Sequence, residues 1–403
     1  MRGEIEVVVA GAVRTPIGRF GGGLSGLTAA EMGASAVAAT LARAGISPAD
    51  VDEVIFGNAR QAGGGPNVAR QIAHRAGLPP EVPAYTVNRA CGSGLQAIVS
   101  AAQAIRCGDA RIVVAGGAES MSRLPHFIGD TGSRLTRFGL AEGDIPIDDG
   151  MYRDGFMCPL CGKLMGETAE ALADLYGISR EEQDAYAALS QTRCEAARRR
   201  DLFDQEIFPI EVKGPGGDIK IVRIDEHPRD GITAESMAKL PPVFRKAGTV
   251  HAGNSSGITD GAAAVVVMEA GEAKRRGLSP AFRLSGHSVA GVDAGVMGIG
   301  PVPAMKKLAA KTGIDLGGVD LVELNEAFAA QVLACVRDLK LDVGRLNVNG
   351  GAIALGHPIG ATGARVVVTL LHEMARRGSR TGIATLCISG GMGMAALFEP
   401  AAA

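Results

Sequence analysis

Cys91 offers the clearest chemistry in this sequence, because it stands between a predicted strand end and a predicted helix start. The segment CGSG at residues 91–94 places glycines beside the thiol. Free N–H groups at a helix start favour a thiolate and can lower a cysteine pKa from about 8.5 toward about 3.5–7.5. Glycines let a substrate carbonyl approach the backbone, whose N–H groups can then hold an oxyanion. The pattern favours a nucleophile, with a small buried cysteine at a tight turn as the alternative.

Three further residues stand in comparable settings. His357 lies between Gly356 and Pro358, so its ring is held on a rigid loop that suits a base or an oxyanion donor, although a lone histidine is more often structural. Cys387 is a second cysteine at a predicted strand end before glycines. Asn325 follows a short apolar strand and is predicted to open a helix, where asparagine by itself is typical of an N-cap.

The surrounding patterns predict an α/β fold that positions these residues. The region from 123 to about 250 differs, because loops rich in glycine, proline and charge surround one helical region at 167–200. There Ser179 and Glu182 predict a capping box. After residue 254 the α/β pattern resumes. The predicted elements of the first part are strands at 5–10, 54–57 and 111–115 and helices at 29–44 and 92–107.

The two α/β parts resemble each other, which indicates an internal repeat. Residues 51–56 parallel residues 319–324, and each part has a Gly-rich turn that leads into a long apolar helix. These helices end at Gly108 and Gly378, and a buried strand follows each of them. Two related halves that face each other place equivalent turns at one centre, so we expect the site to draw residues from both.

Composition excludes several classes of protein. The chain has 403 residues, which allows two to three domains at about 150 residues each. Its 41 Lys and Arg nearly balance 43 Asp and Glu, which argues against general affinity for nucleic acid or an anionic membrane. The seven cysteines are an odd number, so complete pairing within one chain is impossible and reduced thiols are favoured.

The ends and the apolar runs of the sequence predict a cytoplasmic protein without membrane insertion. No run approaches the roughly 18 apolar residues that span a bilayer. Two acidic residues precede the first apolar stretch, and the last residues, EPAAA, match no peroxisomal or retention signal.

Four motifs, taken together and in order, resemble those of the thiolases, the acetyl-CoA acetyltransferases and 3-ketoacyl-CoA thiolases. They are CGSG at 91–94, NEAF at 325–328, GHP at 356–358, and Cys387 with its glycines. Supporting matches lie at 14–22, 165–170, 252–257 and 260–262, so the resemblance covers the whole chain.

The resemblance implies a layered α/β/α/β/α fold with two pseudo-repeated halves, each with a mixed five-stranded sheet, and an inserted loop domain. We predict an N-terminal core half at 1–122 and 254–275, a substrate-covering loop domain at 123–253, and a C-terminal core half at 276–403. The family also implies a homodimer or homotetramer.

By the same resemblance, Cys91 takes the acyl group as a thioester, His357 activates its thiol, and Cys387 is the acid/base. His357 and a water held by Asn325 form one oxyanion site, and the backbone N–H groups of Cys91 and Ser389 form the other. The family usually has glycine where this chain has Ser389, so a positive φ there would cost energy.

Coenzyme A is expected as substrate and product, with no cofactor and no metal. The family match implies that Ser256 contacts the pantetheine arm, that Met165 lines its tunnel and that Phe244 lies by the adenine, with Gly257 in the same motif. Basic residues that could meet its phosphates, or simply form a solvated face, are Lys220, Arg223, Arg229, Arg245 and Lys246.

Two further patterns carry less weight. Gly21, Gly23 and Gly26 have dinucleotide-loop spacing, but the motif does not directly follow its strand. Cys158 and Cys161 form a Cys-x-x-Cys pair without the second pair that a tetrahedral metal site needs. A reversible disulfide in a covering loop is one hypothesis for this pair.

The sequence leaves two alternatives to a thiolase. A ketoacyl-synthase-like condensing enzyme lacks the second active cysteine, so Cys387 argues against it. An inactive, thiolase-like lipid-binding protein is expected to have lost a catalytic residue, whereas Cys91, Asn325, His357 and Cys387 are all present.

Overall fold

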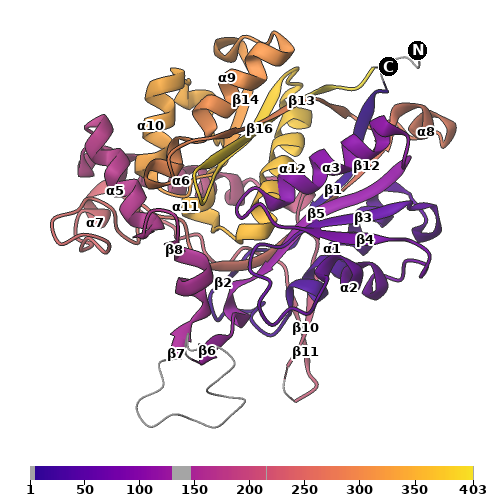
Figure 1. Ribbon diagram of the computed structural model, residues 1–403, viewed down its shortest axis with the longest axis horizontal. Coiled ribbons are helices and arrows are strands. Elements are labelled where there is room, and N and C mark those ends of the chain that lie inside the picture. Colours follow the sequence, from indigo (N-terminus) through magenta and orange to yellow (C-terminus); the bar gives the residue numbers. More distant parts are fainter. Residues whose placement is uncertain (1–4, 129–146, 215, 403) are drawn as a thin grey trace.

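The computed structural model describes residues 5–128, 147–214 and 216–402, and Figure 1 shows how its elements are arranged. The N-terminal half contains β1 (Val7–Arg14), β2 (Gly18–Arg19), α1 (Ala29–Ala44), β3 (Glu53–Gly57), α2 (Val68–Arg75), β4 (Ala84–Val87), α3 (Ser93–Cys107), β5 (Ile112–Ser120), β12 (Thr259–Glu269) and α8 (Ala270–Arg275). The C-terminal half contains β13 (Phe282–Gly291), α9 (Pro301–Thr312), β14 (Leu321–Leu324), α10 (Ala329–Leu339), α11 (Ala352–Leu355), α12 (Ile359–Arg377), β15 (Gly382–Ile388) and β16 (Met392–Pro400).

Strand pairing confirms the predicted repeat. β3 and β5 are parallel, and β12 is antiparallel to β5 and to β1. In the second half, β14 and β15 are parallel, and β16 is antiparallel to β15 and to β13. The strand after β14 is reduced to an isolated bridge between Val322 and Leu346, at the place that β4 takes beside β3.

The two halves share one continuous sheet, whereas the family resemblance implies two five-stranded sheets. The strand order is β14-β15-β16-β13-β1-β12-β5-β3-β4, with β2 paired to β12. The join is short, because β1 and β13 pair only at Val8 with Arg283 and at Val9 with Phe282. The mixed α/β class and the layered arrangement are confirmed.

The two repeat-related helices, α3 and α12, lie side by side at the centre of the molecule (Figure 1). One cluster of buried residues joins them to the inner faces of both halves. A second cluster packs α1 and α2 on the outer face of the first half, and a third packs α9 and α10 on that of the second. A Cβ at Gly94 would lie 2.6 Å from the nitrogen of Ala364, and one at Gly363 would lie 2.3 Å from that of Leu95. Only glycine allows this close crossing of the helices.

Local signals set the helix ends as the sequence predicts. Ser179 caps the helix that follows it and forms the capping box with Glu182. α3 ends at Gly108 and α12 at Gly378, both in the left-handed conformation that favours glycine.

The inserted region lies against both halves (Figure 1). Buried Arg14 of β1 fixes part of it, because its guanidinium donates to Glu206 at 2.7 Å and to Asp225 at 2.7 and 3.0 Å. Residues 129–146 of the predicted loop domain lie outside the described residues. The described elements are β6 (His126–Ile128), β7 (Ile147–Asp149), β8 (Met157–Cys158), β9 (Lys163–Leu164), α5 (Met165–Tyr176), α6 (Arg180–Arg199), β10 (Ile210–Lys213), β11 (Ile219–Val222) and α7 (Ala234–Met237).

Within the three described ranges, no helix combines the length and the apolar character that crossing a bilayer requires.

Candidate active site

A cavity of about 470 Å³ is lined by residues of both halves and of the inserted region. Apolar side chains make up much of its wall, as is usual for a site that binds a small molecule. The predicted site residues that line it are Cys91, Met165, Phe244, Ser256, Gly257, His357, Cys387 and Ser389.

Cys91 lies directly before the N-cap of α3 and is 8% exposed. Burial raises the pKa of its thiol, while the charge of Arg60 and the N–H groups of Ser389 and of Cys91 itself lower it. The net shift is upward, so the expectation that a helix start lowers this pKa is wrong here. Desolvation of a fully buried thiolate outweighs the N–H donors. The resting form is therefore a thiol, and a base must remove its proton.

His357 supplies a neutral imidazole in the same cavity. Its Nδ1 lies 2.6 Å from the hydroxyl of Thr362, and that hydroxyl donates to the carbonyl of Pro358 at 3.0 Å. Because the hydroxyl proton is used there, Nδ1 carries the hydrogen and Nε2 keeps its lone pair. Burial, with the charges of Arg365 and Arg60, lowers the His357 pKa to about 3. The ring is thus neutral at neutral pH and keeps Nε2 as a proton acceptor, while burial disfavours the imidazolium that forms when it takes a proton.

Cys387 lies one residue before the end of β15 and is fully buried. Burial raises its pKa well above the usual value, and the charge of a Cys91 thiolate raises it further. The two thiols therefore interact electrostatically, and they differ in one respect. Both rest as neutral thiols, but the charge of Arg60 and the N–H of Ser389 favour the Cys91 thiolate, whereas the charge of a Cys91 thiolate opposes ionisation of Cys387.

The turn after Cys387 accommodates Ser389 without strain. The residues with positive φ are Gly390, at 85°, and Gly391, at 82°, and Ser389 is not among them. The anticipated cost of serine at this position therefore does not arise. Its N–H points at the sulfur of Cys91, the place where an oxyanion donor for a Cys91 adduct would be needed.

Asn325 follows β14 and is fully buried, but it is not an N-cap. The helix that follows begins at Ala329, with Phe328 at the cap position, so the N-cap reading is wrong. Neither side-chain atom of Asn325 has a hydrogen-bond partner among the described residues. A buried amide without a partner is costly. It lies outside the cavity wall, although Ala327 and Phe328 of the same motif line it.

Glu119, near the end of β5, links the segment after β3 to the first turn of α12. It is not among the residues that the sequence analysis singled out. Its buried carboxylate accepts N–H bonds from Ala59 at 3.1 Å, Arg60 at 3.2 Å and Gly360 at 2.8 Å, and a side-chain bond from Asn58 at 2.8 Å. It holds Arg60 near Cys91 and fixes the start of α12 behind His357. The bond between Glu119 and Gly360 joins residues 241 positions apart, so no local sequence pattern predicts it.

The buried carboxylate of Glu326 likewise fixes the segment that carries Asn325. This carboxylate accepts from Tyr186 at 2.9 Å, from Ser190 at 2.7 Å and from Asn347 at 2.9 Å. Within the NEAF motif, Glu326 thus anchors the loop to α6. The amide of its neighbour Asn325 has no protein partner in the described part of the chain.

The residues expected to contact coenzyme A form the wall around the thiols. Phe244 packs edge-to-face on Phe328, with ring centroids 6.2 Å apart. Gly166 makes room for it, because a Cβ there would lie 2.3 Å from the Phe244 ring. The N–H of Ser256 donates to the carbonyl of Ala327 at 3.0 Å, which ties Ser256 to the NEAF segment in the cavity wall.

The five basic residues named for the phosphates are separated in the structure. Arg229 lines the cavity. Arg245 is ion-paired with two carboxylates, and Arg223 lines a separate surface pocket. The remaining two, which are exposed, are Lys220 and Lys246.

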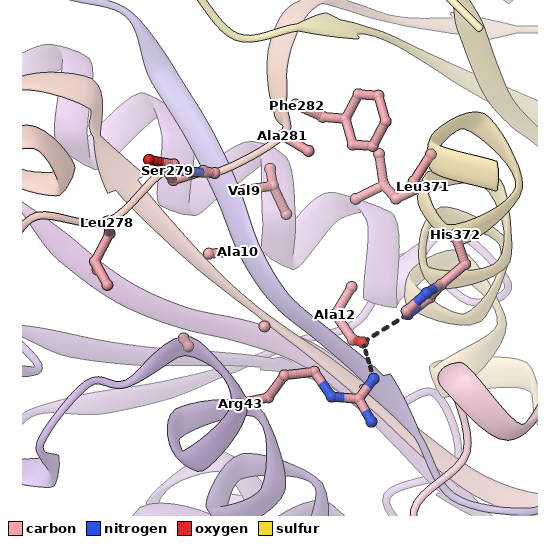
Figure 2. Close-up of a pocket in the computed structure, with 14 residues that line it drawn as sticks. Val9, Ala10, Ala12, Arg43, Leu278, Ser279, Ala281, Phe282, Leu371 and His372 are labelled. Carbon is pink, nitrogen blue, oxygen red and sulfur yellow. Dashed lines mark hydrogen bonds between the residues drawn. The ribbon is translucent and has the colours of Figure 1, made fainter. Parts of the chain in front are cut away.

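Two other features offer no comparable chemistry. The N–H of Gly23, in the apparent dinucleotide loop, donates to the carboxylate of Glu226, so it is not available to a phosphate. A second cavity, of about 340 Å³, lies beside β1. Figure 2 shows that two of its polar side chains, Arg43 and His372, both donate to the carbonyl of Ala12, at 3.1 and 3.0 Å.

Comparison with known proteins agrees with this geometry. Family models for the thiolase N-terminal and C-terminal domains match residues 7–271 and 278–400. The acetyl-CoA acetyltransferase of Allochromatium vinosum is 50% identical over 394 residues, covering 98% of this chain and 99% of that protein. The crystal structure of Bacillus anthracis acetyl-CoA acetyltransferase matches with a TM-score of 0.94 and 45% identity over 99% of each chain. Human mitochondrial 3-ketoacyl-CoA thiolase in complex with CoA matches with a TM-score of 0.93 and 43% identity over 98% of each chain. The chain belongs to the thiolase family.

Proposed function

We propose that this protein transfers acyl groups between acyl-CoA and acetyl-CoA, by thiolytic cleavage of a 3-ketoacyl-CoA or by the reverse condensation of acetyl-CoA. The observation that carries this proposal is the meeting of two buried thiols, each with a raised pKa, and one neutral histidine in a single cavity. A ketoacyl-synthase-like enzyme would not need the second thiol. The retained Cys91, Cys387 and His357 also argue against an inactive lipid-binding relative.

In the cleavage direction, Nε2 of His357 takes the proton of Cys91, and the sulfur attacks the 3-keto carbon. The N–H groups of Cys91 and Ser389 hold the oxyanion that forms. The bond between C2 and C3 then breaks, which leaves an acyl thioester on Cys91 and the enolate of acetyl-CoA. Cys387 gives this enolate its proton.

In the second stage of the reaction, the Cys387 thiolate takes the proton of an incoming CoA thiol. The CoA thiolate attacks the Cys91 thioester and releases acyl-CoA. The Cys91 thiolate that leaves recovers its proton from the His357 imidazolium, so both cysteines are thiols again. We assign the enolate oxygen to His357 and to a water bound by Asn325, whose buried amide has no partner among the described residues. Condensation runs through the same steps in reverse.

Coenzyme A acts as substrate and product, and we propose that no other cofactor and no metal takes part. We place its pantetheine arm along Ser256, Met165 and Gly257 and its adenine near Phe244, because these residues line the cavity that contains the thiols. A cytoplasmic homodimer or homotetramer is the form that we propose, with the core halves and the loop domain divided as predicted from the sequence.

Thiolysis rates for acetoacetyl-CoA and for longer 3-ketoacyl-CoAs, measured on the purified protein, test the activity and give the preferred chain length. Intact-protein mass spectrometry after mixing with acetyl-CoA should show one added acetyl group. Cys91→Ala should abolish this adduct and lower turnover by at least about 10³-fold. Rapid acylation of the Cys91→Ala protein would contradict the assignment.

A further inference from the structure

We propose that Cys158 and Cys161 form a reversible dithiol–disulfide site, which exchanges with small disulfides of the glutathione class and acts on the turn that holds Ser389. This site is separate from the two thiols of the cavity. The described structure has both cysteines as free thiols.

The chain brings the two thiols together by a tight hairpin. β8 and β9 pair Met157 with Leu164 and Cys158 with Lys163. The N–H of Gly162 donates to the carbonyl of Cys158 at 2.8 Å, and Gly162 has φ of 65°. Only two residues separate the cysteines, and each thiol acts on the pKa of the other. The hairpin thus keeps the two thiols near each other, as closure of a ring between them requires.

The two thiols have different surroundings. Cys158 is 2% exposed, whereas Cys161 is partly open to solvent. Burial raises the pKa of Cys158, but the N–H groups of Cys161, Leu160 and Gly390 lower it, and the net shift is downward. Burial and the neighbouring Cys158 raise the pKa of Cys161. The accessible thiol can thus meet an external disulfide, and the buried one is prepared to act as a thiolate.

The exchange needs only the two protein thiols and an external disulfide, written RSSR. The Cys161 thiolate attacks one sulfur of RSSR, which forms a mixed disulfide and expels RS⁻. The Cys158 thiolate then attacks the sulfur of Cys161 and expels the second RS⁻. The sum is two protein thiols plus RSSR giving one protein disulfide plus two RSH, and an excess of RSH reverses it.

A metal does not explain the pair as well. A tetrahedral zinc site needs four ligands, and within the described residues no group of three or more Cys, His, Asp or Glu gathers in metal-binding geometry. Redox exchange needs only the two thiols that are present.

The hairpin touches the turn next to Cys387. Consecutive backbone N–H groups of this turn donate to two different sulfurs, that of Ser389 to Cys91 and that of Gly390 to Cys158. A Cβ added to Gly390 would lie 3.7 Å from Cδ1 of Leu160, so the hairpin tip lies against the turn. In the disulfide, the Cys158 sulfur can no longer ionise and loses most of its power as an acceptor, which weakens the Gly390 contact. This last step rests on the proposed function of Ser389, whereas formation of the disulfide does not.

Peptide mapping of the full-length protein tests the site directly. Trypsin cuts after Arg153 and Lys163, so one peptide, residues 154–163, holds both cysteines and none of the other five. The protein is incubated with glutathione and glutathione disulfide in graded ratios, quenched in acid, alkylated and digested. We expect this peptide to become resistant to alkylation and two hydrogen atoms lighter as the disulfide form increases, and to revert with dithiothreitol.

Cys158→Ser is the matched control for ring closure. It keeps the accessible Cys161 but has no resolving thiol, so the glutathione adduct on Cys161 should persist in this variant and be transient in the unmodified protein. A wild-type peptide that keeps two alkylated thiols in excess glutathione disulfide, or that stops at the adduct, overturns the site.

Thiolysis rates test the connection to the turn, with Cys161→Ser as the variant that cannot form the ring. Oxidation should lower the wild-type rate about tenfold, less than the ~10²-fold cost of deleting an oxyanion donor, and dithiothreitol should restore it. The Cys161→Ser rate should change far less. Equal losses in both proteins would overturn the connection, because they place the damage at Cys91 or Cys387. If neither reduced protein catalyses thiolysis, the proposed function fails, while the mapping result still decides the disulfide.

Discussion

The backbone N–H of Ser389 donates a hydrogen bond to the sulfur of Cys91. The two residues come from different halves of the chain, so this bond joins the proposed nucleophile of one half to the glycine turn of the other. Because an amide N–H serves any residue except proline, the side chain at 389 is free to vary, whereas the backbone geometry of the turn is not.

Ser389→Gly should therefore change turnover less than threefold, while Gly390→Ala should lower it markedly. At Gly390, φ is 85°, and an L side chain in the left-handed region costs roughly 1–2 kcal/mol. Relief of this strain would move the N–H of Ser389. Thiolysis kinetics of the two variants provide the check, with circular dichroism as the control for folding. A Gly390→Ala protein as active as Ser389→Gly would argue against a fixed turn.

Cys387→Ala should still form the acetyl-enzyme but should lose about 10²–10⁴-fold in turnover, the range for a general acid/base. The reason is that, in the proposed mechanism, Cys387 gives and takes the proton in the enolate and CoA steps, whereas His357 activates Cys91. Quenched-flow acetylation and steady-state thiolysis separate these steps. Loss of acetylation together with turnover would contradict the division of roles.

Arg60→Gln should slow alkylation of Cys91 by iodoacetamide. The positive charge of Arg60 lowers the pKa of the Cys91 thiol against the larger effect of burial, so removing the charge raises this pKa. Below the pKa, the thiolate fraction and the alkylation rate should fall about threefold to tenfold, since one pKa unit is a factor of ten. Arg60→Lys keeps the charge and should react nearly as the wild type does. Identical rate–pH curves for Arg60→Gln and wild type would show that the charge does not act on Cys91.

Glu323→Gln should reduce the loss of stability with rising pH. Glu323 is fully buried, 3.6 Å from Arg365, and burial raises its pKa to about 8. Between the unfolded value, about 4.3, and about 8, the folded protein holds a proton that the unfolded chain releases. This contribution is complete below the unfolded pKa and is lost as the pH rises through the folded pKa, by up to about 1.4 kcal/mol per pH unit. Urea unfolding midpoints of both proteins at about pH 5.5 and about pH 8.5 measure it. Midpoints that move in parallel would place the titration elsewhere.

The sequence predicts those features of this protein that depend on residues close together in the chain. The capping box of Ser179 and Glu182 involves four consecutive positions, and the glycines around Cys91 and Cys387 are adjacent to the thiols they serve. Such features depend on one turn of chain. They were sufficient to predict α6 and to single out Cys91 and Cys387, whereas Met165, Phe244 and Ser256 were implied only by the family resemblance.

Features that depend on distant partners were not predicted. Glu119 is polar and inconspicuous in sequence, and its function comes from Gly360, 241 positions away. The upward pKa shift of Cys91 depends on how completely the other half buries it. The N-cap interpretation of Asn325 was wrong although its local sequence fits an N-cap, because the helix begins only at Ala329, after Phe328 in extended conformation.

The crossing of α3 and α12 at Gly94 and Gly363 has a consequence for how the enzyme can change over time. Because each backbone fills the space where the other would carry a Cβ, neither glycine can be replaced first and compensated later at the other position. The distance between the Cys91 end of one helix and the His357 end of the other is therefore protected from gradual drift. The loops around the cavity remain free to diversify the acyl groups it accepts, over a catalytic centre that the helices keep constant.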